Sequence, residues 1–278
     1  KDLDYVEDLV LDIRDRKSLK KVVNEVQPDF IFHLAAQSLV KKSYDNPLET
    51  FTSNTVGTLN ILESFLQIQK RCHAVIITSD KSYKNLEIKR GYREEDLLGG
   101  DDPYSGSKGA AEIILNSYFK SLISKRKNLS FTIARAGNVI GGGDWSEDRI
   151  IPDCIKSWSK NRKALIRNPN STRPWQHVLE VIRGYLHSAI IGKRNHKKLN
   201  GEAFNFGPNN YQNRSVIQLV KFMKRNWDLV SWKIKKEKSN KKKESVLLKL
   251  NSNKSKNLLY WEPILKFEES VKLTASWY

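Results

Sequence analysis

The chain alternates between short apolar runs and longer segments that have apolar residues at every third or fourth position. The apolar runs have the length of buried β-strands and occur at residues 9–11, 30–36, 74–78, 131–135 and 203–207. Helical spacing is found at residues 17–25, 47–65, 109–122, 150–158, 181–191 and 216–227. Pro28 ends the first helix, and Pro47 begins the next one.

Strands that alternate with helices predict an α/β fold whose parallel sheet is covered by helices on both faces. The alternation weakens after Val139, where a loop with three consecutive glycines at 141–143 and polar, aromatic stretches at 167–169 and 173–178 follow. We therefore expect a main domain over residues 1–139. A smaller lobe over residues 140–278 should follow, with some of its segments returning to the main sheet.

Composition restricts the protein only broadly. A chain of 278 residues can bury a sizeable core, and no apolar run in it is long enough to span a bilayer. Cys72 and Cys154 have neither the number nor the spacing of a disulfide framework or a metal site. We expect a cytoplasmic protein with no metal and no membrane partner.

The formal net charge of +18 is high for a soluble protein. Much of the excess lies in a lysine-rich tract at residues 233–256, which is typical of a solvated face. Lysine without interleaved arginine and aromatic residues is a weak signal for nucleic acid, so we expect no nucleic-acid partner. Part of the positive charge could instead attract an anionic nucleotide substrate.

Candidate chemistry centres on Tyr104 and Lys108, which lie one helical turn apart on the same face of a predicted helix. A phenol is a poor base near neutral pH, but a neighbouring ammonium favours the phenolate. Ser79 follows the apolar run 74–78, at the carboxyl end of a predicted strand, where α/β sheets bind ligands. Ser, Tyr and Lys in this order indicate proton transfer by a nicotinamide-dependent enzyme that acts on an alcohol.

Further blocks occur around these residues in a fixed order: DIRD at 12–15, HLAA at 33–36, NTVGT at 54–58, TSD at 78–80, YSGSK at 104–108 and RAGNV at 135–139. They resemble the extended short-chain dehydrogenase/reductase family, which includes the nucleotide-sugar epimerases and dehydratases. The resemblance implies a Rossmann-like, doubly wound NAD-binding domain, a substrate-binding lobe and a nucleotide-sugar substrate.

Within the family, three stretches are similar to the CDP-glucose 4,6-dehydratase branch, namely SDKSYKN at 79–85, GGDW with DRIIPD between 142 and 153, and RNP with RPWQHVLE between 167 and 180. The dTDP-glucose dehydratases normally carry Glu where Lys81 stands, and epimerases normally lack the Asp of Asp80. CDP-glucose is therefore the expected substrate. Another nucleotide-sugar dehydratase or epimerase, acting on dTDP-glucose or GDP-mannose for example, and a non-catalytic NAD-binding protein are the alternatives.

The resemblance implies hydride removal from the sugar C4 to NAD, loss of water across C5 and C6, and hydride return to C6. Tyr104, assisted by Ser79 and Lys108, would take the C4 hydroxyl proton. Asp80 would protonate the departing C6 hydroxyl, which requires a raised pKa. Lys81 would act as the C5 base, or would stabilise enolate charge while Asp80 or a water moves the proton.

The same blocks imply the binding residues. The cofactor contacts would come from Asp12, Ile13, Leu34, Ala35, Ala36, Thr78, Tyr104 and Lys108. The substrate contacts would come from Asn138, Arg149, Arg173 and His177, because a guanidinium fork matches phosphate oxygens. His33 is expected to be a structural hydrogen-bonding residue.

The family's glycine-rich strand–turn–helix, whose helix N-terminus binds the pyrophosphate, has no counterpart in this sequence. We expect the sequence to be a fragment of a longer enzyme that alone binds NAD weakly. The family commonly dimerises through the helix carrying Tyr104 and Lys108 and the long helix before it. Apolar Ala110, Ile113, Ile114 and Leu115 permit a homo-oligomer, either a dimer or a tetramer.

Overall fold

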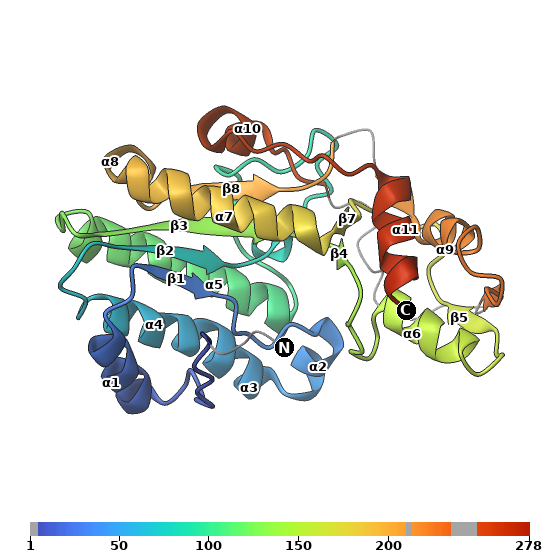
Figure 1. Ribbon diagram of the computed structural model, residues 1–278, viewed down its shortest axis with the longest axis horizontal. Coiled ribbons are helices and arrows are strands. Elements are labelled where there is room, and N and C mark those ends of the chain that lie inside the picture. Colours follow the sequence, from blue (N-terminus) through green and yellow to red (C-terminus); the bar gives the residue numbers. More distant parts are fainter. Residues whose placement is uncertain (1–4, 210–212, 235–248) are drawn as a thin grey trace.

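The computed structural model describes residues 5–209, 213–234 and 249–278, and its main feature is a parallel sheet between two helical layers (Figure 1). Within these residues the sheet has the strand order β1-β2-β3-β8, and every neighbouring pair is parallel. Its strands are β1 (Phe30–His33), β2 (Cys72–Ile77), β3 (Leu129–Ala136) and β8 (Ala203–Phe206). The central strands β2 and β3 are buried along almost their whole length, as both faces of a covered sheet require.

One face of the sheet is covered by the helices that precede and follow β2. They are α1 (Arg16–Val26), α3 (Pro47–Phe51), a π-helical turn η1 (Thr52–Val56), α4 (Gly57–Phe65) and α5 (Pro103–Tyr118), which continues as the π-helical turn η3 (Phe119–Ile123). Leu62, Phe65 and Leu115 pack there against Ala74 and Phe131 of the sheet. The predicted helix 47–65 is thus one helical segment, interrupted by a π turn.

The opposite face is covered by α7 (Val178–Arg194) together with α8 (His196–Leu199) and α10 (Asn253–Leu259). Val181 and Tyr185 of α7 join Phe204 and Phe206 of β8 and the fully buried Trp261 in one apolar cluster. Because α7 and β8 come after residue 139, part of the second half of the chain returns to the main sheet. The predicted α/β fold with helices on both faces is confirmed.

A second apolar core lies beside the sheet, on the right in Figure 1. It packs residues such as Trp158, Met223 and Val271 around short strands. Its elements are β4 (Val139–Ile140), α6 (Ile150–Trp158), β5 (Ala164–Ile166), β6 (Thr172–Arg173), β7 (Gln176–His177), β9 (Arg214–Ser215), α9 (Val216–Met223), β10 (Trp232–Ile234) and α11 (Phe267–Trp277). The predicted helix 150–158 is found with the same bounds, whereas the predicted helix 216–227 ends at Met223.

The strand predicted at residues 9–11 is wrong, because this segment pairs with no described strand. Val10 is 95% exposed, so its side chain has no sheet face to cover. A strand needs a hydrogen-bonding neighbour, and apolar sequence alone does not provide one. The predicted strand 30–36 is shorter than expected and ends at His33, after which the chain turns away as a loop.

Most of the predicted lysine-rich tract lies outside the described residues. Its described end belongs to α10, where Lys254 pairs with Glu202 at 2.5 Å and Lys256 with Glu262 at 2.6 Å. Both cysteines are buried free thiols in different apolar clusters. Among the helices that the structure describes, none has the length and apolar character needed to cross a membrane.

Candidate functional site

The predicted site residues gather where β1, β2 and β3 end. Ala35 and Ala36 follow β1, Ser79 and Asp80 follow β2, and Asn138 follows β3. Because these strands are parallel, their carboxyl ends meet at one edge of the sheet, the edge where such sheets bind ligands. Ser79 and Asp80 are buried there, although they lie in a loop and a single 3₁₀ turn, η2 (Asp80–Ser82).

The first two turns of α5 supply Tyr104 and Lys108 to the same edge. The Asp102 carboxylate caps the helix by accepting hydrogen bonds from the Ser105 amide at 2.9 Å and from the Ser105 hydroxyl at 2.6 Å. Pro103 occupies the first helical turn, where its missing N–H costs nothing. Tyr104 and Lys108 then lie one turn apart, and both are buried.

The Tyr104 phenol is hydrogen-bonded with Ser79 and is affected by the charges of Asp80, Arg149 and Asp102. Burial raises the pKa of Tyr104 to about 12, while a hydrogen bond with Ser79 and the positive charge of Arg149 act in the opposite direction. The Ser79 hydroxyl also donates to Asp80 Oδ1 at 3.0 Å and accepts from the Lys81 amide at 3.2 Å. Ser79 therefore connects the phenol to the acidic side chain next to it.

Lys108 is a buried cation. Burial lowers its pKa to about 8, against the opposing effect of the Glu112 carboxylate one turn further along α5. Within the described residues its ammonium makes no hydrogen bond or ion pair. A buried ammonium with unused donors suits a ligand that carries hydroxyl groups beside Tyr104.

Asp80 is a buried carboxyl group, with 3% of its surface exposed. Burial raises its pKa, and the charges of Lys81 and Arg173 and the hydrogen bond from Ser79 oppose this shift without cancelling it. Asn138, which has a left-handed φ of 52°, donates to Asp80 Oδ2 at 3.3 Å. A raised pKa keeps a carboxyl group protonated and able to act as an acid.

Gly137 makes room for the buried Asp80 carboxyl group, a role that was not predicted from the sequence. A β-carbon at position 137 would lie 1.9 Å from Asp80 Oδ2 and 2.1 Å from its Cγ, which no side chain tolerates. The end of β3 can therefore approach the Asp80 carboxyl only because residue 137 is glycine. A glycine at the end of a predicted strand was the signal in the sequence.

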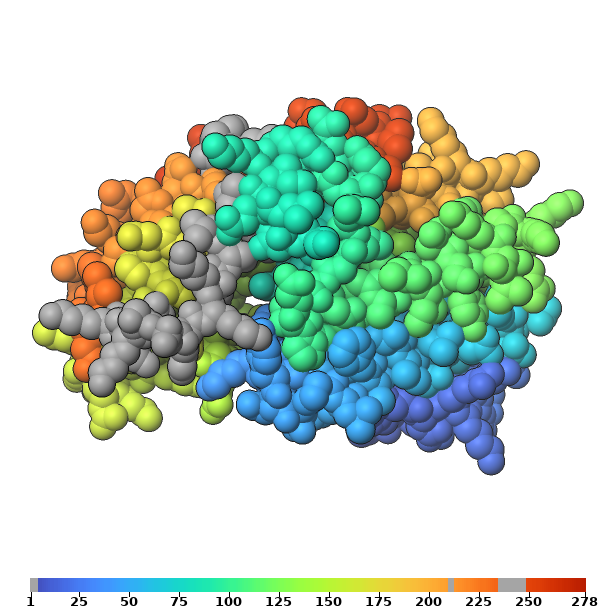
Figure 2. All heavy atoms as spheres, turned by 180° about the vertical axis from the view of Figure 1, so that it is seen from behind, coloured from blue at the N-terminus to red at the C-terminus, as the bar shows by residue number. Residues whose placement is uncertain are grey.

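Arg149 spans the space between the two parts of the molecule. Its guanidinium pairs with Asp144 at 3.3 Å and donates to Ser38, on the sheet side, at 3.1 Å. Asp148 likewise pairs with Lys41 of α2 (Val40–Asp45) at 2.9 Å and with Arg167 at 3.1 Å. Figure 2 shows a hollow in the surface beside the blue α2 region and the green start of α5.

The other predicted substrate residues lie on the short strands of the second lobe. Arg173 is buried on β6, and its charge acts on Asp80. His177 on β7 is the N-cap residue of α7, because its Nδ1 accepts from the Leu179 amide at 3.3 Å. Burial lowers the pKa of His177, and within the described residues it shows no hydrogen bond to a catalytic group.

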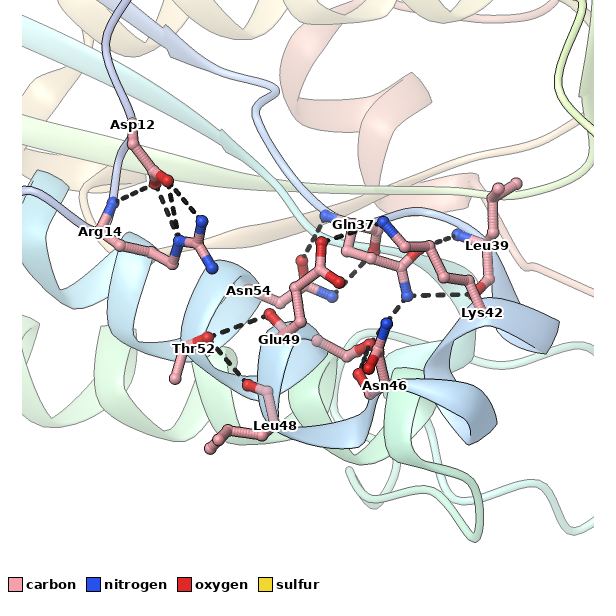
Figure 3. Close-up of polar contacts among 11 residues, drawn as sticks. Asp12, Arg14, Gln37, Leu39, Lys42, Asn46, Leu48, Glu49, Thr52 and Asn54 are labelled. Atoms are coloured by element: carbon pink, nitrogen blue, oxygen red, sulfur yellow. Dashed lines mark hydrogen bonds and ion pairs between the residues drawn. The ribbon is translucent and has the colours of Figure 1, made fainter.

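On the cofactor side, Asp12 and Ile13 precede α1. The Asp12 carboxylate is paired with Arg14 at 2.5 Å, and hydrogen bonds from Arg14 lower its pKa to about 2 (Figure 3). Ile13 packs against Gly57 of α4, where any side chain would overlap it. Of the predicted cofactor residues after β1, Leu34 and Ala35 are exposed and Ala36 is half-buried.

The loop after β1 is fixed by Asn54 in the π turn (Figure 3). Its side-chain oxygen accepts from the Gln37 amide at 2.8 Å, and its nitrogen donates to the Gln37 carbonyl at 3.0 Å and to Ser107 of α5 at 2.9 Å. His33, expected to be structural, is buried and is hydrogen-bonded with Thr58 at 3.1 Å. Burial lowers its pKa to about 4, so it is neutral.

Thr78, a predicted cofactor residue, is buried, and its hydroxyl donates to Glu112 of α5 at 2.6 Å. Glu112 also forms a buried ion pair with Arg135 of β3. Neither charged residue received a role from the sequence, although Glu112 lies four positions after Lys108 on the same helical face. Across the described residues, no three His, Cys, Asp or Glu side chains are grouped closely enough to hold a metal ion.

The arrangement thus combines a phenol and a lysine, one helical turn apart, with a carboxyl group of raised pKa and two arginines. The phenol can exchange a proton with an alcohol, and the carboxyl group, when protonated, can donate a proton to a leaving group. Two guanidinium groups beside them suit an anionic substrate. Such a set fits the oxidation and elimination that the sequence blocks imply.

Comparison with known proteins agrees with this geometry. Residues 6–274 match the family model described as GDP-mannose 4,6 dehydratase. The chain is 40% identical to the CDP-glucose 4,6-dehydratase of Salmonella typhimurium over 282 residues, which covers 99% of this chain and 77% of that protein. The resemblance inferred from the sequence blocks is confirmed.

Solved structures show the same fold. An epimerase from Methanothermobacter thermautotrophicus superimposes with a TM-score of 0.85 at 25% identity, over 100% of this chain and 79% of that one. The dTDP-glucose 4,6-dehydratase of Bacillus anthracis, solved in complex with NAD, gives a TM-score of 0.78 at 21% identity, over 100% of this chain and 81% of that one. The chain belongs to the GDP-mannose 4,6 dehydratase family.

Proposed function

We propose that this protein is a CDP-glucose 4,6-dehydratase that converts CDP-glucose to CDP-4-dehydro-6-deoxyglucose and water. The observation that carries the reaction type is Asp80, a buried carboxyl group with a raised pKa beside the Ser79–Tyr104 pair. An epimerase has no use for such an acid, whereas a dehydratase must protonate a departing hydroxyl. The 40% identity to a CDP-glucose 4,6-dehydratase supports the choice of substrate.

NAD is the cofactor, and when bound it accepts the hydride from the sugar C4 and returns it at C6. The buried, unpaired ammonium of Lys108 fits its ribose hydroxyls, and the small residues Ala35 and Ala36 leave space for it along the end of β1. Asp12 and Ile13 would lie at the adenine end. The Thr78 hydroxyl is bonded to Glu112, so any contact from Thr78 to the cofactor uses other atoms.

Proton transfer at C4 is the task of Tyr104. In the described state burial holds Tyr104 in its neutral form. The hydrogen bond with Ser79 and the positive charge of Arg149 favour the phenolate that takes the C4 hydroxyl proton. The Lys108 ammonium, one helical turn away, would add to this effect. The resulting C4 ketone makes the C5 hydrogen acidic.

Elimination across C5 and C6 is the task of the neighbouring 3₁₀ turn. Asp80 protonates the C6 hydroxyl as it leaves. Lys81 lies beside it, and its positive charge, which acts on the Asp80 carboxyl, stabilises the enolate. In a Lys81→Met variant, unchanged exchange of the C5 proton with solvent would assign the base role to Asp80 or a water, and its loss would assign it to Lys81.

The substrate diphosphate is held by Arg149 and Arg173, with Asn138 beside them. Arg149 has the reach, because it already crosses from the second lobe to Ser38. Residues 140–278 would then supply most of the substrate lobe and residues 1–139 the NAD-binding domain. His177 contributes to this region by fixing the start of α7.

We also assign the enzyme to the cytoplasm, in keeping with its free thiols, and propose a homo-oligomer. Leu115 is part of the core, but Ile113 on the outer face of α5 is 62% exposed and Leu122 is 45% exposed. An apolar outer face on the catalytic helix favours self-association through α4 and α5.

A product assay tests the proposal. The full-length gene product is incubated with NAD and, in parallel, with CDP-glucose, dTDP-glucose or GDP-mannose, and products are analysed by mass spectrometry. We expect loss of one water from CDP-glucose only. Water loss from another sugar nucleotide would keep the mechanism and overturn the substrate, and a product of unchanged mass with altered stereochemistry would establish an epimerase.

A further inference from the structure

A buried ion pair lies under the turn that carries Ser79, Asp80 and Lys81. Glu112 and Arg135 have 1% and 4% of their side-chain surfaces exposed, and the guanidinium donates to both carboxylate oxygens. A buried pair of this kind adds little net stability, because desolvation offsets its attraction. Its bidentate geometry does, however, fix the relative position of α5 and β3.

The residue before the turn is bound to the acidic member of the pair. Thr78 donates its hydroxyl to Glu112 Oε1 at 2.6 Å, and its backbone amide donates to the Ala134 carbonyl at 2.9 Å. Thr78 is followed directly by Ser79. Because Glu112 belongs to α5, this hydrogen bond holds Ser79 at a set distance from the helix that carries Tyr104 and Lys108.

The residue after the turn is bound to the basic member. Arg135 donates to the Tyr83 hydroxyl at 2.7 Å, and its guanidinium carbon lies 4.7 Å from the centre of the Tyr83 ring. The Tyr83 hydroxyl in turn donates to Asn205 of β8 at 2.8 Å. Within the turn itself, the Ser82 hydroxyl donates to the Ser79 carbonyl at 2.7 Å.

We propose that Glu112 and Arg135 are a positioning pair for the turn 79–82. Glu112 binds Thr78 before the turn and Arg135 binds Tyr83 after it, and together they set the position of the turn relative to Tyr104. The inference rests on the proposed dehydratase function, since it concerns where Ser79 and Asp80 stand relative to the substrate. Neither charged residue touches substrate. Each acts through the residue that flanks the turn.

The test releases one anchor at a time without exposing a buried charge. Thr78→Val and Tyr83→Phe each remove one hydroxyl and leave the Glu112–Arg135 pair intact. We expect kcat to fall about 10-fold or more in each variant, because small misplacements of reacting groups are costly. KM for CDP-glucose should stay close to that of the parent enzyme, and the melting temperature should fall only as far as the loss of one buried hydrogen bond requires.

A spectroscopic readout separates misplacement of the turn from general damage. Asp80, the acid of the elimination step, lies on the released turn. Of the three groups that serve C4 oxidation only Ser79 lies there, because Tyr104 and Lys108 belong to α5, which does not move. Elimination should therefore slow more than C4 oxidation, and the near-ultraviolet absorbance of reduced nicotinamide should accumulate after mixing with CDP-glucose. Equal slowing of both steps would overturn the proposal.

Tyr118→Phe is the matched control. It removes a hydroxyl that donates to a carboxylate, Glu63, at 2.8 Å, from the far end of α5. It should leave kcat unchanged, and an equal loss of kcat in this variant would contradict a specific role for the two anchors.

Amide hydrogen exchange tests the anchors independently of activity, so failure of the proposed function is distinguishable from failure of this inference. The Lys81 and Ser82 amides are bonded to the Ser79 hydroxyl and carbonyl. They should exchange faster in Thr78→Val and Tyr83→Phe, and at the parental rate in Tyr118→Phe. Parental exchange in all three variants would overturn the anchoring even if the substrate proved to be different.

Discussion

Burial determines the protonation of three side chains in the candidate active site. It raises the pKa of Asp80 and of Tyr104 and lowers that of Lys108. In each case burial shifts the pKa in the direction of the neutral form, because an unpaired charge is costly in an enclosed site. Lys108, with a pKa of about 8, still carries its charge at neutral pH. A raised pKa favours the proposed acid role of Asp80, whereas the proposed base role of Tyr104 requires activation by its neighbours.

Removing the Asp80 proton should separate the two halves of the reaction. In Asp80→Asn we expect dehydration to slow by about 10²- to 10⁴-fold, the usual contribution of a general acid. C4 oxidation does not need this proton, so reduced nicotinamide should accumulate when CDP-glucose is added. Stopped-flow absorbance with product analysis measures both steps, and parental dehydration by Asp80→Asn would rule out its role as the acid.

Lys108 should destabilise the fold at neutral pH. The pKa of Lys108 is 10.5 for a solvated side chain and about 8 in the folded chain. Between pH 8 and pH 10.5 the unfolded chain therefore binds more protons than the folded chain. Stability is therefore lower below about pH 8 and rises toward pH 10.5. Lys108→Met should gain roughly 3 kcal/mol at neutral pH, by the usual conversion of a pKa shift into free energy.

Thermal unfolding of Lys108→Met across this pH range measures the effect. The stability gain should shrink as pH rises and disappear near 10.5. A gain that does not depend on pH would mean that packing, rather than the buried charge, accounts for it.

Gly137 should be irreplaceable for activity. In Gly137→Ala the new β-carbon would push the Asp80 carboxyl aside, and we expect a loss of kcat on the order of 10²-fold. Gly106→Ala is a suitable control, because its added carbon would meet the Phe51 ring at an ordinary 3.4 Å and would favour the helix. Steady-state kinetics of both variants measure the effect. Equal activities would contradict the claim that only glycine at position 137 leaves room for the Asp80 carboxyl group.

Single residues were predictable where the chemistry appears in local spacing. Tyr104 and Lys108 are one turn apart in the sequence, and Ser79 follows an apolar run. Glu112 and Arg135 were not predictable, because their partners Thr78 and Tyr83 become neighbours only after the strands and α5 pack together. Tertiary contacts of this kind leave no periodic signal in a single sequence.

At the scale of elements, hydrophobic periodicity predicted correctly those helices and strands whose apolar faces are buried in a core. The helix at 150–158 has the predicted bounds because its apolar face covers a core, and β2 and β3 are buried as expected. The strand at 9–11 failed because pairing depends on a neighbour that sequence pattern does not reveal. The π turn Thr52–Val56 also escaped prediction, although its Asn54 fixes the loop after β1.

Ion pairs between α2 and the loop before α6 should help to hold the substrate. Asp148 pairs with Lys41 and Arg167 and precedes Arg149, so Asp148→Asn should loosen the placement of Arg149. Exposed pairs contribute up to about 1 kcal/mol, so we expect KM for CDP-glucose to rise about 2- to 5-fold with little change in kcat.

Glu49→Gln provides the comparison for this variant. Glu49 pairs with Lys42 at the same 2.9 Å that separates Lys41 from Asp148, but it does so without reaching the second lobe (Figure 3). KM should be parental in Glu49→Gln. A KM that rises equally in both variants would point to a general loss of charge pairing in place of a specific link.

At the scale of the whole molecule, the main sheet and the second apolar core position different residues of the candidate site. The main sheet brings the ends of β1, β2 and β3 together with the start of α5, and the second core carries the short strands with Arg173 and His177. The return of α7 and β8 to the main sheet ties the two parts together. The alternation of strands and helices in the sequence predicted the main sheet. The strands around the second core have only two or three residues, which is too short to produce a recognisable sequence pattern.

The central claim is that one site oxidises C4 and reduces C6 of the same sugar. The most direct measurement follows the fate of the C4 hydrogen. CDP-glucose that carries deuterium at C4 is incubated with the full-length enzyme and NAD, and the product is examined by NMR and mass spectrometry. We predict deuterium at C6 of a 4-keto-6-deoxy product. Deuterium that stays at C4, or a product that has lost it to solvent, would contradict the account.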